Sequence, residues 1–124
     1  MECGTYEIRY YCKADGENPV KDFVQTLSSK SQQKFYAKTC MLLKTMGPRT
    51  PMPHAKPLGD GLYELRVQHA EDTFRILYFF SRRYIVLTNG FRKKTKGLTQ
   101  RELEIAKVRR NEILEGIRKG EIQL

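Results

Sequence analysis

Residues 62–91 read LYELRVQHAEDTFRILYFFSRRYIVLTNGF, and this segment is dominated by apolar and aromatic side chains. Apolar and polar residues alternate over 62–68, which is the pattern of a strand with one buried face. Glu64 and Arg66 fall together on the polar face of that strand. The segment therefore predicts a sheet that carries charged side chains on one of its surfaces.

Two further strands are predicted directly downstream. Residues 73–80 are more continuously apolar, with Arg75 as the exception, and residues 84–91 begin with an apolar run. The connections at 69–72 and 81–83 are short enough for hairpins. We therefore expect three consecutive antiparallel strands.

Upstream of the sheet, the pattern predicts one strand and a pair of helices. Residues 5–12 alternate between apolar and polar side chains, which favours a first strand. Asn18 is placed to cap a helix, and Ser29 with Gln32 fits a capping box that begins a second one. Gly47, followed by proline, is expected to end the second helix. The short link between the two helices predicts an antiparallel hairpin.

The remaining segments are a proline-rich loop and a final helix. Residues 47–61 carry four prolines, so we expect a restrained loop there. Thr99 and Glu102 form a second capping box, and the helix that follows should reach Ile113 or beyond. Its arginines, Arg109 and Arg110, are expected on the solvated face.

The element order is therefore β-α-α-β-β-β-α in one domain that spans residues 1–124. We predict an α+β fold in which a small, twisted, mostly antiparallel sheet carries an N-terminal helical hairpin and a C-terminal helix. The length of 124 residues fits a single core.

Composition narrows the class of partner. The chain is 40% hydrophobic and 30% charged, which is typical of a globular domain, and it contains no apolar run long enough for a membrane helix. Neither a basic start nor an apolar block marks the first residues, so we expect a cytoplasmic protein with free thiols. The formal net charge of +9 favours anionic partners such as nucleic acid.

Metal and cofactor sites are not expected. His54 and His69 lie in different loops without supporting cysteines or carboxylates. The chain lacks the glycine-rich loops that hold nucleotide phosphates.

Cations gather instead where the last strand ends. Residues 88–97 read TNGFRKKTKG, which places four cations within five positions, and this density favours a phosphate-bearing partner. Arg66 and Arg75 belong to neighbouring strands. Because an unpaired buried charge is costly, Arg75 must either pair with Glu64 or reach an anion together with Arg66. Both alternatives are compatible with the sequence.

Aromatic and loop residues complete the predicted surface. Phe91 and Tyr78 could stack on unpaired bases, although Tyr78 shares a strand face with apolar residues and also fits the core. His54 and Lys56 come from the proline-rich loop and would reach the same surface if that loop folds over the sheet.

Three motifs in order resemble RelE-type toxins. They are KPLGDGLYELR at 56–66, RILYFF at 75–80 and NGFRKKT at 89–95. Within that superfamily the chain is most similar to the phage-derived, HigB-like branch of toxin–antitoxin systems. The similarity extends over roughly residues 6–114.

The resemblance implies a ribosome-dependent endoribonuclease that cleaves mRNA in the ribosomal A site and needs no cofactor. The implied reaction is attack of an RNA 2′-hydroxyl on the adjacent phosphate. It further implies a cognate antitoxin, in this branch often a helix-turn-helix DNA-binding protein. The residues that match the family's catalytic surface are Arg66, Arg75, Lys93 and Lys94. The residues expected to bind RNA are His54, Lys56, Tyr78, Phe91, Arg92 and Lys96.

Several points stay open at this level. The general base is not defined, because this chain has Phe91 and the cations after it where some relatives carry a histidine; His54 is one candidate for acid or base. A ParE-like inhibitor of DNA gyrase would share the architecture. A phage nucleic-acid-binding module without catalytic activity would share the basic surface.

Overall fold

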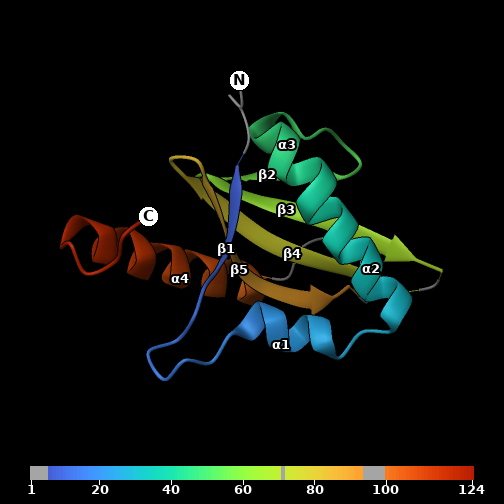
Figure 1. The fold of residues 1–124 in the computed structure, drawn as a ribbon, viewed down its shortest axis with the longest axis horizontal. Helices are drawn as coiled ribbons and strands as arrows, with labels where there is room; N and C mark the ends of the chain where they lie inside the picture. Colours follow the sequence, from blue (N-terminus) through green and yellow to red (C-terminus); the bar gives the residue numbers. More distant parts are fainter. Residues whose placement is uncertain (1–5, 71, 94–99) are drawn as a thin grey trace.

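The computed structural model describes residues 6–70, 72–93 and 100–124. One five-stranded sheet forms the centre, in the order β1-β5-β4-β3-β2. Helices lie on both of its faces, with α2 crossing one face and α4 lying on the other (Figure 1). The elements, in chain order, are β1 (Glu7–Tyr10), α1 (Pro19–Gln25), α2 (Ser29–Ala37), η1 (Lys38–Leu43), α3 (Lys44–Met46), η2 (Gly47–Arg49), β2 (Ala55–Gly59), β3 (Leu62–His69), β4 (Asp72–Ser81), β5 (Tyr84–Arg92) and α4 (Gln100–Arg118).

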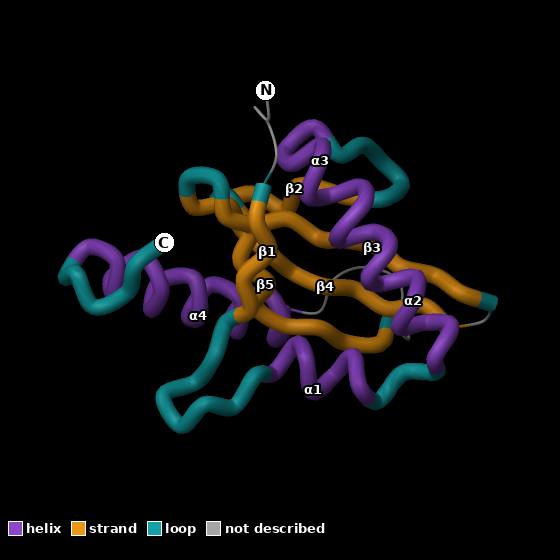
Figure 2. The backbone as a smooth tube through the Cα atoms, in the orientation of Figure 1, coloured by secondary structure: helices purple, strands orange, loops and turns teal. Residues whose placement is uncertain are grey.

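The predicted α+β class is confirmed. Strands β2 to β5 pair antiparallel, and β3, β4 and β5 are the three strands expected from the alternation of residues 62–91. β1 lies at the edge beside β5 and pairs with it in parallel, as Figure 2 shows. The sheet is therefore mostly antiparallel, with one parallel edge.

Side chains alternate between two cores. One face packs on α1 and α2 through apolar residues that include Val24, Phe35 and Ile76. The other face packs on α4 through Leu77 and Ala106. Because successive strand residues point to opposite faces, the register fixes which charged residues share a surface.

The prediction of a loop over residues 47–61 is wrong in part, since β2 forms within it. β2 pairs with β3 at the sheet edge, and its register shifts between Pro57 and Gly59. Lys56 and Pro57 are both exposed. Proline is tolerated on an edge strand because its missing N–H is not needed by a further neighbour. The element order therefore contains one strand more than the pattern predicted.

The second helix begins one residue earlier than the capping box predicted. Ser28, not Ser29, is the cap, and its Oγ accepts from the Ser31 N–H at 3.2 Å. The Gln32 amide donates to the Leu27 carbonyl at 2.9 Å instead of closing a box. The helix continues through a π-helical turn, η1, to Met46, and Gly47 ends it with a φ of 56°. The predicted cap Thr99 lies outside the described residues.

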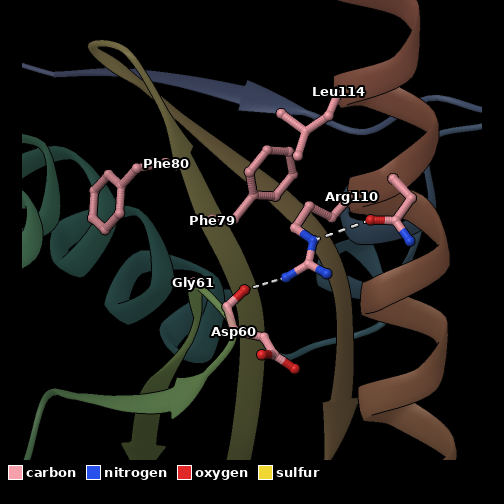
Figure 3. A pocket seen from close by; sticks show the side chains of 7 residues that line it. Asp60, Gly61, Phe79, Phe80, Arg110 and Leu114 are labelled. Atoms are coloured by element: carbon pink, nitrogen blue, oxygen red, sulfur yellow. Dashed lines mark hydrogen bonds between the residues drawn. The ribbon is translucent and has the colours of Figure 1, made fainter.

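Helix α4 is attached to the sheet by its arginines, so the prediction that these are only solvated is wrong. Arg109 Nη1 donates to the Thr88 carbonyl at 2.8 Å, and its guanidinium lies 5.1 Å from the centre of the Tyr11 ring. The Tyr11 hydroxyl in turn donates to Glu112. Arg110 donates to the Asp60 carbonyl in the β2–β3 turn (Figure 3).

None of the helices in the described part of the chain has the length and apolar character needed to cross a lipid bilayer.

Candidate nucleic-acid interface

The centre of the candidate site is a row of three side chains across three strands. Arg66 on β3 is paired with Arg75 on β4, and Arg75 is paired with Phe91 on β5. Paired residues of neighbouring strands point to the same face, so the two arginines and the aromatic ring share one surface. We call these three residues the Arg–Arg–Phe row. It lies on the sheet face that carries α4.

The first turn of α4 is tied to the sheet beside this row. Asn89 Nδ2 donates to the Glu102 side chain at 2.9 Å and to its backbone carbonyl at 3.2 Å. Phe91 is half-buried and packs against the core under α4. The helix therefore covers part of this face and fixes one side of the row.

Glu64 is the acidic residue that organises the row. It is 4% exposed, and its Oε1 lies 3.2 Å from Arg66 Nε and 3.6 Å from Arg75 Nε. The expected alternative in which Arg75 pairs with Glu64 is thus confirmed as an ion pair. The longer distance exceeds a hydrogen bond, and the Arg75 Nε is buried without a hydrogen-bond partner among the described residues.

Arg75 is the more deeply placed of the two arginines, at 9% exposure. Its burial lowers its pKa, and the charge of Arg66 acts in the same direction, while Glu64 opposes both. Guanidinium groups nevertheless remain protonated in proteins. A buried cation with an unused donor and only one shared carboxylate favours the approach of a second anion.

Lys93 extends the cationic surface beyond the end of β5. Its backbone N–H donates to the Thr73 carbonyl at 2.9 Å, so the chain continues the strand pairing at this point. The pKa of Lys93 is lowered, first by burial and then by the charges of Arg75, Arg66 and Lys56, with Glu64 acting in the opposite direction. Lys93 therefore lies within electrostatic reach of the whole row.

The proline-rich segment meets the row from the β2 side. The His54 carbonyl accepts from the Arg66 N–H at 2.8 Å, and Lys56 is paired with Glu64 in the sheet register. The Nδ1 of His54 is buried and has no hydrogen-bond partner in the described part of the chain. The structure thus brings both residues beside Arg66 and Glu64, but it does so by pairing the segment at the sheet edge and not by folding it over the sheet as predicted.

Two of the predicted RNA-binding residues lie elsewhere. Tyr78 is fully buried on the opposite sheet face and stacks on Tyr63 at 5.5 Å between ring centres. Its ring has no surface left for a base, so the alternative core assignment is correct.

Arg92 is paired with Phe74 in the register and therefore points to the α1–α2 face, where it forms an ion pair with Asp72. Lys94 and Lys96 lie outside the described residues.

Two residues of the site were missed or undervalued from the sequence. The alternation over 62–68 placed Glu64 on the face of Arg66, but only the packing shows that it is buried between two guanidinium groups. Lys38 was not singled out at all. Its Nζ donates to the Arg66 carbonyl at 2.6 Å, from the first residue of the π-helical turn. Nothing in the helical pattern distinguishes it from a solvated lysine.

Other features do not coincide with the row. The described residues contain no group of three histidine, cysteine or acidic side chains placed to hold a metal ion. A hollow of about 340 Å³ lies between α4 and the β2–β3 turn, lined in part by Asp60, Phe79, Arg110 and Leu114 (Figure 3). Phe79 and Leu114 close one side of it, and Phe80 points away. It contains no residue of the row.

The arrangement defines a small α+β domain with a cationic sheet surface. Residues 22–111 match the family model described as phage-derived protein Gp49-like (DUF891). The match covers well over half of the chain, and the protein belongs to this family, which falls in the RelE/toxin-like group. No curated protein shows a significant match to the chain.

Proposed function

We propose that this protein is the toxin of a type II toxin–antitoxin system and acts as a ribosome-dependent mRNA endoribonuclease. The observation that carries the proposal is the Arg–Arg–Phe row, in which two guanidinium groups and one aromatic ring share a surface with Lys93 close by. The membership in the Gp49-like family supports the toxin class. The cleavage chemistry and the ribosomal target are our inference.

The reaction that suits this surface is attack by the RNA 2′-hydroxyl on the adjacent phosphate. The bond from the 2′-oxygen to phosphorus forms, the hydroxyl proton passes to water, and the bond from phosphorus to the 5′-oxygen breaks, which leaves a 2′,3′-cyclic phosphate. Charge builds on the non-bridging oxygens of the pentavalent phosphate, and planar guanidinium forks stabilise such oxygens in pairs. Arg75 supplies the buried, oriented cation and Arg66 the more accessible one. Glu64 holds both in place through one carboxylate oxygen.

Lys93 is the group to which we assign proton transfer. As an ammonium it would give a proton to the leaving 5′-oxygen, and its lowered pKa makes that transfer easier than for an ordinary lysine. Phe91 would support a base of the strand whose phosphate lies over Arg75. A ribosome that orients the mRNA would provide the remaining alignment, so we expect only weak activity on free RNA.

The direct test is mapping of mRNA 5′ ends on translating ribosomes incubated with the purified protein. Wild-type protein should produce cuts in the A-site codon, and Arg75→Ala or Lys93→Ala should reduce cleavage by about a hundredfold or more. Arg83→Ala and Lys21→Ala are matched controls, because both residues are exposed and neither belongs to the row or its neighbours. Both controls should cleave like wild type.

The absence of A-site cuts with active ribosomes would refute the endoribonuclease. Inhibition of gyrase supercoiling by the same protein would then support a ParE-like inhibitor instead. Harmless expression without a cognate antitoxin would contradict the toxin class as a whole. The proposed partner is an antitoxin with a helix-turn-helix domain, and co-purification from its natural operon tests this directly.

A further inference from the structure

A stripe of lysines runs along α2 and the π-helical turn that follows it, on the sheet face opposite the Arg–Arg–Phe row. Lys30, Lys34 and Lys38 are spaced four residues apart, which places them on one side of a helix at steps of about 6 Å. Like charges at this spacing disfavour the helix. None of the three forms an ion pair within the described residues. The repulsion among the three lysines is therefore not relieved by any ion pair of the described residues, although Lys38 donates a hydrogen bond to the Arg66 carbonyl.

The outer part of this stripe opens into a hollow between α2 and the end of β3. Its volume is about 440 Å³, within the range of about 300–1,000 Å³ that ligand sites occupy. We call it the α2 hollow; its lining residues are Lys30, Gln33, Lys34, Ala37 and His69. Two ammonium groups, an amide and an imidazole supply hydrogen-bond donors, which suits an anion rich in acceptor oxygens.

The α2 hollow is connected to the Arg–Arg–Phe row through Lys38. Lys38 Nζ donates to the Arg66 carbonyl, so its charge lies directly against the β3 strand of the row. The pKa of Lys38 is lowered by burial, then by Lys34 on the outer side and Arg75 on the inner side. One lysine thus interacts with both the hollow and the row. It reaches Arg66 beyond the last β2–β3 pair, Ala55 with Leu65, at the edge of the sheet that separates the two faces.

We propose that the α2 hollow and Lys38 bind the sugar–phosphate backbone of single-stranded RNA that flanks the phosphate held at Arg66 and Arg75. The inference rests on the proposed function, because it assumes that the row holds an RNA phosphate. Successive lysines along the stripe then meet successive phosphates of an extended strand. The hollow contributes affinity and orientation, while the chemistry remains at the row.

A non-cleavable RNA separates this inference from catalysis. Binding of a fluorescent, fully 2′-O-methylated oligonucleotide is measured by anisotropy across a series of salt concentrations, once with a trinucleotide and once with a dodecanucleotide. The double variant Lys30→Ala/Lys34→Ala is compared with Lys13→Ala/Lys21→Ala, which removes the same charge from an exposed region outside the hollow. Both variants keep the full chain.

Loss of the two hollow lysines should weaken dodecanucleotide binding about tenfold and flatten the slope of log affinity against log salt by about 1.4. The trinucleotide should bind equally to the variant and to wild type, because it is too short to reach from the row to the hollow. The control variant should leave both oligonucleotides unaffected. An unchanged slope and affinity in the hollow variant would overturn the inference.

The two proposals fail in different ways. A length-dependent loss of RNA binding without any ribosomal cleavage would sustain the hollow and refute the endoribonuclease. Ribosomal cleavage together with unaltered RNA binding in the hollow variant would support the endoribonuclease and refute RNA binding by the hollow. If the hollow variant instead loses affinity for a glutamate-rich peptide but not for RNA, the surface serves an acidic protein and the inference is wrong.

Discussion

The buried carboxylate of Glu64 is shared by two arginines, of which Arg75 is nearly buried and Arg66 is partly exposed. A buried ion pair is expensive to form, but removal of one member is more expensive still, because the remaining charge is left uncompensated. Here Glu64 Oε1 lies 3.2 Å from Arg66 Nε and 3.6 Å from Arg75 Nε, so two cations share one anion. The arrangement keeps Arg66 and Arg75 oriented while leaving the surface positive, which is a useful combination for a phosphate-binding surface.

Replacing Glu64 by the isosteric glutamine should therefore destabilise the protein. The amide oxygen still accepts from Arg66, but the two guanidinium groups lose their counter-charge, so the free energy of unfolding should fall by about 1–3 kcal/mol. Urea denaturation followed by circular dichroism measures this change. Glu7→Gln is the control, since its ion pair with Arg9 is about half exposed, and it should cost about 0–1 kcal/mol. Equal effects of the two substitutions would contradict the assigned role of Glu64.

The lowered pKa of Lys93 gives a second prediction at the same scale. If the protonated amine is the acid, cleavage should fall as the pH rises through that pKa, which lies below the usual lysine value of about 10.4. The rate of ribosomal cleavage as a function of pH measures this alkaline limb. Lys93→Ala should remove the limb along with most of the activity. A rate that instead rises with pH across the same range would assign Lys93 as the base.

At the scale of elements, β2 and α4 are attached to the rest of the sheet by different contacts. β2 adds an edge to β3 through a short irregular pairing, and its proline faces no further strand. α4 is secured by polar contacts at the other side, where Arg109 reaches Thr88 and the Tyr11 hydroxyl reaches Glu112. These contacts join the helix to the segment that follows β1 and to β5, so α4 and the N-terminal part depend on one another.

Tyr11→Phe should loosen α4. Loss of the hydrogen bond to Glu112 should lower the free energy of unfolding by about 1–2 kcal/mol near neutral pH. Hydrogen exchange at α4 amides should accelerate, whereas Tyr36→Phe, which alters an exposed ring, should change neither. Unaltered exchange in Tyr11→Phe would show that the hydrogen bond from Tyr11 to Glu112 does not help to hold the helix.

Tyr11 also predicts how the free energy of unfolding changes at alkaline pH. Burial, followed by the hydrogen bond to Glu112, raises the pKa of Tyr11 from 10 to about 12. The folded state thus favours the neutral phenol, so this contribution is complete below about pH 10 and disappears as the pH rises to about 12. The stability of Tyr11→Phe should accordingly decline less steeply over this interval than that of wild type, as measured by urea unfolding at successive pH values.

At the scale of the whole molecule, the sheet was predictable and parts of its surface were not. The alternation of residues 62–68 predicted the shared face of Glu64 and Arg66. The shared parity of Phe74 and Tyr78 favoured a core position for Tyr78, although Tyr78 was also expected among the RNA-binding residues. β2 was not predicted because its proline-rich segment shows no alternation of apolar and polar residues. An edge strand can pair through its backbone without such alternation. Lys38 was not predicted because its partner is the Arg66 carbonyl, which lies just beyond the pair formed by Leu65 and the first residue of β2, Ala55.

The net charge of +9 predicts that salt has opposite effects on folding and on binding. Raising the ionic strength from about 0.01 M to about 0.1 M shortens the screening length from about 30 to about 10 Å, which relieves repulsion among the lysines and arginines of the folded state. The free energy of unfolding should rise, while RNA affinity should fall. Urea denaturation measures the free energy of unfolding and fluorescence anisotropy measures RNA affinity, and both are followed against salt concentration with the same protein preparation. A fall in stability over this range would contradict net self-repulsion.

The parallel pairing of β1 with β5 has a consequence for synthesis. Glu7 is registered with Tyr84, so β1 finds its partner only after β5 has been synthesised and has left the ribosome. Contacts between such distant parts of a chain form late, because a long loop must close before they stabilise anything. The nascent chain therefore carries an incomplete sheet during most of its translation. Under the proposed function, the chain would therefore stay inactive at least until β5 has left the ribosome that makes it.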